Sequence, residues 1–131
     1  MEKAVNMIVV VNRNYLLLTK IREGDFWILP GGRIEEGESE EVAIRKEIGE
    51  ELPNIRILKL IPYKKFKGTT PHTKVKVIVS TFFAGITGSI EPGAEITETT
   101  FSLINSLKEL NLTLISKDII KSLKKDGYLI K

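Results

Sequence analysis

Runs of apolar residues separated by short polar segments predict a chain of strands with helices set among them. The runs at residues 4–11 and 15–21 are rich in β-forming residues, and the Asn-Arg-Asn between them is typical of a hairpin. Further strands are predicted at residues 26–29, 55–62, 74–84 and 99–103. The strand at 26–29 runs into Pro30-Gly31-Gly32, which predicts a loop.

The clearest helix signal follows that loop. Ser39 is a suitable N-cap, and the two glutamates after it favour the helix dipole. Ile44, Ile48 and Leu52 recur every four residues and predict a buried face. Pro53 ends the helix, since the residue before a proline avoids the helical conformation.

The end of the chain predicts more helix. A short helix follows the strand at 99–103 as far as Leu110, and Ser116 is the expected cap of a last helix with an apolar stripe. That stripe consists of Ile119, Ile120 and Leu123. The order strands, helix, strands, helix fits an α+β or mixed α/β/α sandwich. We expect residues 1–131 to form a single domain, because this length supports one core.

Composition narrows the class of protein. At 42% hydrophobic and 28% charged residues, the chain is typical of a globular protein. No run approaches the roughly 20 apolar residues of a membrane helix, so no membrane partner is expected. The absence of cysteine excludes disulfides and zinc-thiolate sites. Cytoplasm is the default location.

The net charge of +3 hides a segregation of charge along the chain. Eight of the 17 acidic residues lie between residues 35 and 51, whereas residues 52–90 hold seven lysines and arginines and no acid. An acidic site beside a basic stretch suits a metal-bridged polyphosphate ligand; a solvated lysine-rich hairpin is the alternative. Nucleic acid as a partner would require more aromatic interleaving than Tyr63 and Phe66 provide.

Three carboxylates stand out on the first helix. Glu47, Glu50 and Glu51 project to one side within about one turn. Such neighbours repel one another unless a cation lies between them, and Mg²⁺, with Mn²⁺ as a substitute, prefers oxygen ligands of this kind. We therefore predict a metal site here; a solvated acidic face is the alternative.

The spacing around these glutamates resembles the Nudix box, Gly-x5-Glu-x7-Arg-Glu-U-x-Glu-Glu-x-Gly-U, in which U is a bulky aliphatic residue. Of its nine specified positions, six match: Gly32, Glu38, Glu47, Ile48, Glu50 and Glu51. Lys46 replaces the Arg, Pro53 the Gly and Asn54 the last aliphatic residue. Lysine keeps the charge of the arginine but loses its planar fork of donors.

The resemblance to these MutT-like hydrolases implies a mixed sheet between helices and hydrolysis of a nucleoside diphosphate linked to another group. It also implies Glu47, Glu50 and Glu51 as metal ligands. In this family the general base is sometimes a box glutamate and sometimes a carboxylate on a later loop. We take Glu47, Glu50 and Glu98 as candidate catalytic residues, with Glu98 preferred to Glu95, although both of these could be solvated loop residues.

Four residues are candidates for binding substrate. Gly31 and Gly32 permit close approach of the backbone, and Arg33 could contact a phosphate or be solvated. Trp27 could stack on a base, although a lone Trp on a strand more often lies in the core. His72 is expected at the surface.

The sequence thus predicts a Mg²⁺-dependent pyrophosphohydrolase. ADP-ribose, a nucleoside triphosphate and a dinucleoside polyphosphate all stay open as substrates. The departures at Lys46 and Pro53 motivate an alternative, a non-catalytic nucleotide-binding module. A third reading, an acidic helix that serves a protein partner, leaves the glycine spacing unexplained. Strand edges in the first 21 residues are candidate surfaces for a homodimer.

Overall fold

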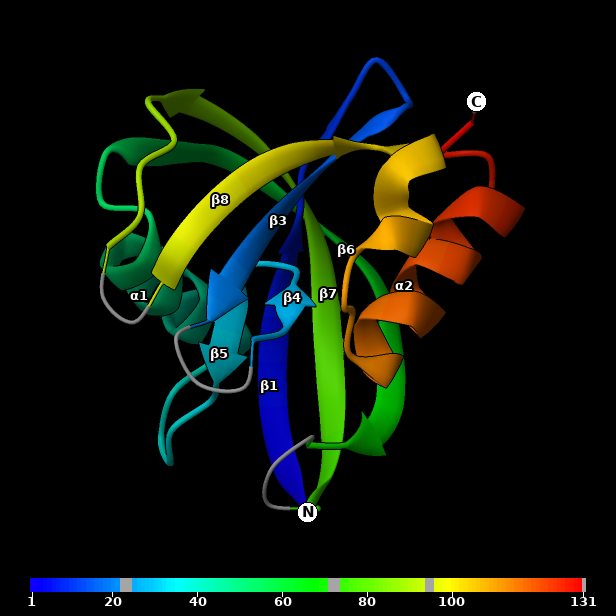
Figure 1. Cartoon of the computed structure of the whole chain (residues 1–131). Helices are drawn as coiled ribbons and strands as arrows, with labels where there is room; N and C mark the ends of the chain where they lie inside the picture. The colour runs from blue at the N-terminus through cyan, green and yellow to red at the C-terminus, as the bar shows by residue number, and fades with distance from the viewer. Residues whose placement is uncertain (22–24, 71–73, 94–95, 131) are drawn as a thin grey trace.

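Two four-stranded sheets lie between two helices in the computed structural model (Figure 1). The structure describes residues 1–21, 25–70, 74–93 and 96–130, so His72 and Glu95 lie outside the described residues. The elements are, in chain order, β1 (Glu2–Ile8), β2 (Val10–Val11), β3 (Tyr15–Ile21), β4 (Trp27–Ile28), β5 (Gly31–Arg33), α1 (Glu40–Glu51), β6 (Ile55–Thr69), β7 (Lys76–Gly88), β8 (Ile96–Leu103), the 3₁₀ helix η1 (Ile104–Glu109) and α2 (Leu114–Lys125). The mixed α+β fold that the sequence predicts is confirmed.

The first sheet has the strand order β5-β1-β7-β6 and is mixed, because β1 and β7 are parallel while the outer pairs are antiparallel. In the second sheet, β3 pairs antiparallel with β8 along its whole length and with β2 and β4 at its two ends. β5 is therefore an edge strand, and it lies against α1 together with its neighbour β1.

Strand alternation divides the apolar residues between two cores. On β1, Val5 and Met7 pack toward α1, whereas Ile8 packs toward α2. The side chains of β3 are divided in the same way. Leu17 packs with Val5 and Met7 in the core beneath α1, called the first core, whereas Leu16 and Leu18 pack in the second core, beneath α2. Successive side chains of a strand point to opposite faces, so these two central strands anchor both helices.

α1 forms as its sequence predicts. The Ser39 Oγ accepts a hydrogen bond from the Val42 N–H at 3.1 Å, which confirms it as the N-cap. Ile44, Ile48 and Leu52 are buried, and the Leu52 N–H closes the helix on the Ile48 carbonyl at 2.8 Å. Full burial of each of these side chains contributes about 1.5–3 kcal/mol.

Several predicted boundaries are wrong for identifiable reasons. β6 continues through Pro62 to Thr69, because β6 is an edge strand, where a missing N–H is tolerated. β7 begins at Lys76 rather than residue 74, since Lys74 has a φ of 58° that no strand accommodates. The first apolar run is divided at Val9 into β1 and β2.

Two further predictions are corrected near α2 and β5. The N-cap of α2 is Thr113, whose Oγ1 accepts from the Ser116 N–H at 3.3 Å; Ser116 itself is buried in the first turn. Gly31 and Gly32 lie in β5 rather than in a loop, because they pair with Asn6 and Val5 of β1. None of the helices in the described ranges is long and apolar enough to cross a membrane.

A β-bulge in β6 directs the side chains of two neighbouring residues, Tyr63 and Lys64, toward α2. Pro62 pairs with Phe82 and Lys65 with Ser80, so Tyr63 and Lys64 together face the single residue Thr81. The buried Thr81 hydroxyl donates to the Lys64 carbonyl at 2.6 Å and accepts from the Lys64 N–H at 3.1 Å. The side chain of Thr81 thus satisfies backbone groups that the bulge would leave unpaired.

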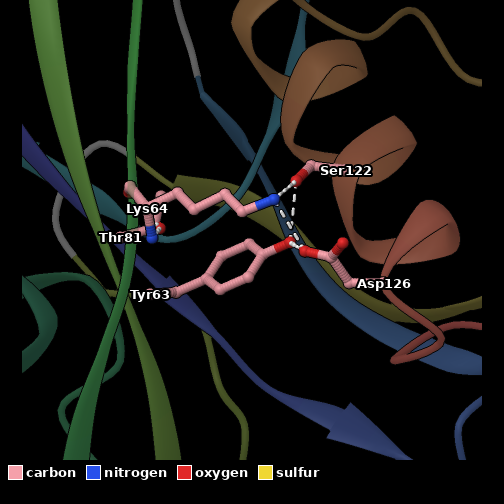
Figure 2. Close-up of polar contacts among 5 residues, drawn as sticks. All are labelled: Tyr63, Lys64, Thr81, Ser122 and Asp126. Carbon is pink, nitrogen blue, oxygen red and sulfur yellow. Dashed lines mark hydrogen bonds and ion pairs between the residues drawn. The ribbon is translucent and has the colours of Figure 1, made fainter.

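The bulge allows Tyr63 and Lys64 to hold the end of α2 together (Figure 2). The Tyr63 hydroxyl lies 2.7 Å from the Ser122 Oγ and donates to Asp126 Oδ2 at 2.6 Å. The Lys64 Nζ lies 2.7 Å from the same Oδ2 and 3.1 Å from the Ser122 Oγ. Residues 63, 64, 122 and 126, called the α2 clamp below, dock this helix on the first sheet.

We expect Thr81→Val to lower the free energy of unfolding by about 1–3 kcal/mol, because it leaves the part-buried N–H and C=O groups of Lys64 without the partner that the buried Thr81 hydroxyl provides. Thr87→Val is the matched control, since Thr87 is exposed on the same strand and its change should stay within about 0.5 kcal/mol. Urea denaturation measures both. Equal effects in the two variants would contradict the assigned role of Thr81.

Candidate functional site

The candidate site is built where α1 crosses the edge strand β5. A Cβ added to Gly32 would lie 2.5 Å from the carboxyl carbon of Glu47, which is closer than any side chain could approach. Glycine at position 32 therefore lets the Glu47 carboxylate lie directly against the backbone of β5. This contact explains physically why a glycine and a glutamate occur at this spacing in the sequence.

Glu51 reaches the same strand one residue earlier. The Gly31 N–H donates to its Oε1 at 3.1 Å. A Cβ on Gly31 would lie 1.9 Å from the Val5 carbonyl oxygen, so close packing of β1 also demands glycine here. Two carboxylates of α1, four residues apart, thus meet consecutive glycines of β5.

The carboxyl of Glu47 lies in an environment that disfavours its negative charge. Burial raises the pKa of its carboxyl above the usual range, and the negative charge of Glu50 raises it further. Both effects disfavour the ionised form, and a cation placed beside these oxygens would offset both. Glu50 itself is exposed on the next turn.

These residues suit a divalent ion by their chemistry. Glu47 and Glu51 would hold it, because carboxylate oxygens are the donors that Mg²⁺ and Mn²⁺ prefer. The structure does not bring Glu50, the third ligand expected from the sequence, to β5 with them. Within the described residues, no group of three or more acidic or histidine side chains stands close enough to form a complete ligand set. Water would therefore supply the remaining ligands, as is usual for Mg²⁺.

Glu38 and Lys46 tie the segment before α1 to the helix. The Glu38 Oε1 accepts from the Glu35 N–H at 2.8 Å, and its Oε2 lies 2.7 Å from the Lys46 Nζ. The pKa of Glu38 is lowered, first by the hydrogen bond from Lys46. Lys46 thus keeps a carboxylate partner although it lacks the planar fork of arginine.

The far end of α1 is attached to the segment that leads into β8. The Gly93 N–H donates to the backbone carbonyl of Glu51 at 2.7 Å, which satisfies an acceptor that the helix end leaves open. The position of β8 relative to the glutamates is thereby linked to α1.

Glu98 lies on β8 and forms an ion pair with Lys20 of β3. Its Oε2 lies 3.4 Å from the Lys20 Nζ, which also contacts Asp25 at 2.7 Å. The pairing of β3 with β8 shifts at this point, and the extra residue, Thr97, donates its hydroxyl to the Lys20 carbonyl at 3.2 Å. Among the described residues, the polar partner of the Glu98 carboxylate is Lys20 rather than a residue of α1.

A pocket of about 220 Å³ lies on the other side of β5, between the strands and the first turn of α2. Gly31, Gly32 and Arg33 line it, as do the polar residues Asn6, Thr113 and Ser116. The Arg33 side chain is 61% exposed, and its Nη1 lies 3.6 Å from Oε2 of Glu2.

Trp27 does not line this pocket. It is half-buried against the core beneath α2, and its ring centre lies 5.9 Å from the Lys20 Nζ.

Sequence reasoning missed Asn6 and Lys20. The Asn6 Nδ2 donates to the Leu29 carbonyl at 3.1 Å and so holds the chain just before β5. A single amide within an otherwise apolar run was the available signal. Lys20 lies near the end of the apolar run at residues 15–21 and carried no comparable signal, since its partner Glu98 comes from a distant segment.

Comparison with known proteins gives a family and a fold. A family model described as NUDIX domain matches residues 2–123. Comparison with curated proteins finds no match.

Among solved structures, a MutT NUDIX hydrolase from Burkholderia pseudomallei has a TM-score of 0.81 at 19% identity, over 92% of this chain and 95% of that one. A mutator MutT protein from Bacillus halodurans has a TM-score of 0.73 at 24% identity, over 92% and 80%. A bifunctional NMN adenylyltransferase/ADP ribose pyrophosphatase from Francisella tularensis has a TM-score of 0.72 at 18% identity, over 96% of this chain and 41% of that one. At these identities the likeness is one of fold.

The contact between Gly32 and Glu47 predicts a weakened metal site in Gly32→Ala. The added methyl group would displace the Glu47 carboxylate, so we expect Mn²⁺ affinity to fall about 10–100-fold. Gly49→Ala is the matched control, because a Cβ there meets nothing within 4 Å. It should keep Mn²⁺ affinity and gain about 0.5–1 kcal/mol of stability. Electron paramagnetic resonance titration measures free Mn²⁺ directly, and equal affinity in the two variants would count against the site.

Proposed function

The chain belongs to the Nudix hydrolase family, and we propose that it cleaves a nucleoside diphosphate linked to a second group, with a divalent metal ion bound at Glu47 and Glu51. The observation that carries this proposal is the double contact of these carboxylates with Gly32 and Gly31. A hydrolase needs a fixed set of hard oxygen ligands beside a backbone that a phosphate can approach, and this contact supplies both.

The edge position of β5 supports the placement of the substrate. The carboxylates lie against one side of β5 and the 220 Å³ pocket opens on the other, so both share Gly31 and Gly32. A diphosphate at the free edge of β5 would lie beside the carboxylates while the rest of the ligand enters the pocket. Asn6, Thr113 and Ser116 would then offer hydrogen bonds to its polar groups.

The charge of the diphosphate is the main obstacle to attack by water. When bound, Mg²⁺ neutralises phosphate oxygens and lowers the pKa of a coordinated water, and Mn²⁺ substitutes for it. Glu47 and Glu51 would hold the metal ion. The ion pair of Glu38 with Lys46 fixes the segment that precedes α1.

Glu98 is our candidate for the general base. Its pairing with Lys20 at 3.4 Å is an ion pair between partly exposed groups, which costs only about 0.2–1 kcal/mol to break. Glu98 can therefore turn toward a bound water, while the bulge at Thr97 sets the direction from which it turns.

We expect metal-dependent cleavage of at least one compound in a panel of ADP-ribose, nucleoside triphosphates, dinucleoside polyphosphates and nucleotide sugars. Release of phosphate or mononucleotide is measured with Mg²⁺ and with chelator. Glu51→Gln should lower turnover about 10²-fold or more, because it removes a ligand charge. Glu41→Gln, on the exposed face of the same helix, should retain it. If no compound of the panel is cleaved but nucleotides still bind, the protein would be a nucleotide-binding module rather than a hydrolase.

Glu98→Gln should lower kcat about 10²–10⁴-fold with little change in KM, since an amide cannot accept the proton of the attacking water. Glu109→Gln is the control, because Glu109 is an exposed glutamate of η1. Steady-state kinetics on the substrate found in the panel provide the comparison. Full kcat in Glu98→Gln would assign the base to a glutamate of α1 instead.

A further inference from the structure

A second and larger pocket lies between the far end of β1 and the end of α2. Its volume is about 600 Å³, within the range of small-molecule sites, and it shares no lining residue with the 220 Å³ pocket. Its apolar wall includes Ile8, Val10 and Phe83, and its polar rim includes Arg13 and Asp126. The hydrolytic site described above uses none of these residues.

Asp126 presents a preorganised acceptor to this pocket. Tyr63 and Lys64 both contact its Oδ2, at 2.6 and 2.7 Å, whereas no hydrogen bond from the described residues reaches Oδ1 (Figure 2). The Lys64 hydrogen bond, followed by that of Tyr63, holds the pKa of Asp126 below its usual range. The carboxylate is thus ionised and held in one orientation, with one oxygen available to an N–H donor.

An aromatic surface stands beside this acceptor. The Tyr128 ring is packed 4.6 Å from Phe83 and 5.7 Å, edge to face, from Tyr63, measured between ring centres. Tyr128 nevertheless remains 45% exposed and lines the pocket. A ring held by two others offers a rigid platform for stacking at little entropic cost.

Arg13 supplies a cation at the same rim. Its Nη2 donates to the Gly127 carbonyl at 2.8 Å, which places the guanidinium beside the pocket. The clamp of α2 requires only Oδ2 of Asp126, and the contact of Arg13 with the end of α2 uses only Nη2. Neither contact explains the open Oδ1 or the exposed Tyr128 ring.

We propose that this pocket is a second ligand site, which binds an amino-bearing purine nucleotide away from the hydrolytic site. The base stacks on Tyr128, its amino group donates to Asp126 Oδ1, and its phosphate lies near Arg13. A planar aromatic ring, an N–H donor and an anion are the three features that the pocket complements. This inference does not depend on the proposed hydrolysis, since the two sites share no residue.

The test uses adenosine 5′-monophosphate, which has no diphosphate to cleave, with the full chain in chelator. Binding is measured by calorimetry and located by backbone amide NMR. We expect shifts at residues 12–13 and 126–128. Purine riboside 5′-monophosphate, which differs only in lacking the amino group, should bind about tenfold more weakly.

Asp126→Asn and Tyr128→Leu should each weaken binding about tenfold or more. Asp118→Asn is the matched control, because Asp118 is an exposed carboxylate of the same helix that lines neither of the two pockets, so it should keep affinity within about threefold. Glu51→Gln should also keep full affinity, whether or not the chain proves to be a hydrolase.

Three results would overturn the proposal. They are absence of binding at millimolar nucleotide, shifts confined to Asn6, Gly31, Gly32 and Thr113, and equal affinity for the two nucleotides. The second of these would place the nucleotide in the 220 Å³ pocket.

Discussion

The contact between α1 and the two glycines of β5 is the constraint on which the candidate site depends. Because Gly32 has no side chain, Glu47 lies against the backbone of the strand, and the Gly31 N–H binds Glu51. β5 can occupy that position only because β1 pairs with it and packs Val5 and Met7 beneath α1. One close approach therefore links the first core, the edge of the first sheet and the acidic helix.

Two bulges extend this arrangement to residues that strand periodicity alone would not bring together. In β6 the bulge directs Tyr63 and Lys64 to the same side, so that both reach α2. In β8 the extra residue Thr97 binds the Lys20 backbone and leaves Glu98 beside the Lys20 side chain. Bulges re-aim side chains at the cost of ladder hydrogen bonds, and at both sites a threonine hydroxyl provides a replacement.

Several of the segregated charges are paired with an opposite charge in the structure. Glu41 pairs with Arg45 along α1, Glu38 pairs with Lys46, and Lys64 pairs with Asp126. Glu47 differs, because burial and the charge of Glu50 both raise the pKa of its carboxyl. Lys46 lowers that pKa only in part, so Glu47 keeps a raised pKa at the position where the family pattern implies a metal.

Short-range signals were sufficient for α1 and β3. The Ser39 cap, the four-residue spacing of Ile44, Ile48 and Leu52, and the apolar run of β3 all depend on neighbours within a few residues. The six box positions singled out Glu47 and Glu51, but the contacts of these glutamates with Gly32 and Gly31 were visible only in the structure. Tertiary structure decided the rest, because Lys20 and Glu98 are 78 residues apart and Tyr63 and Asp126 are 63 apart. Such pairs depend on strand register and bulges, which arise from long-range pairing and leave no periodic trace in the sequence.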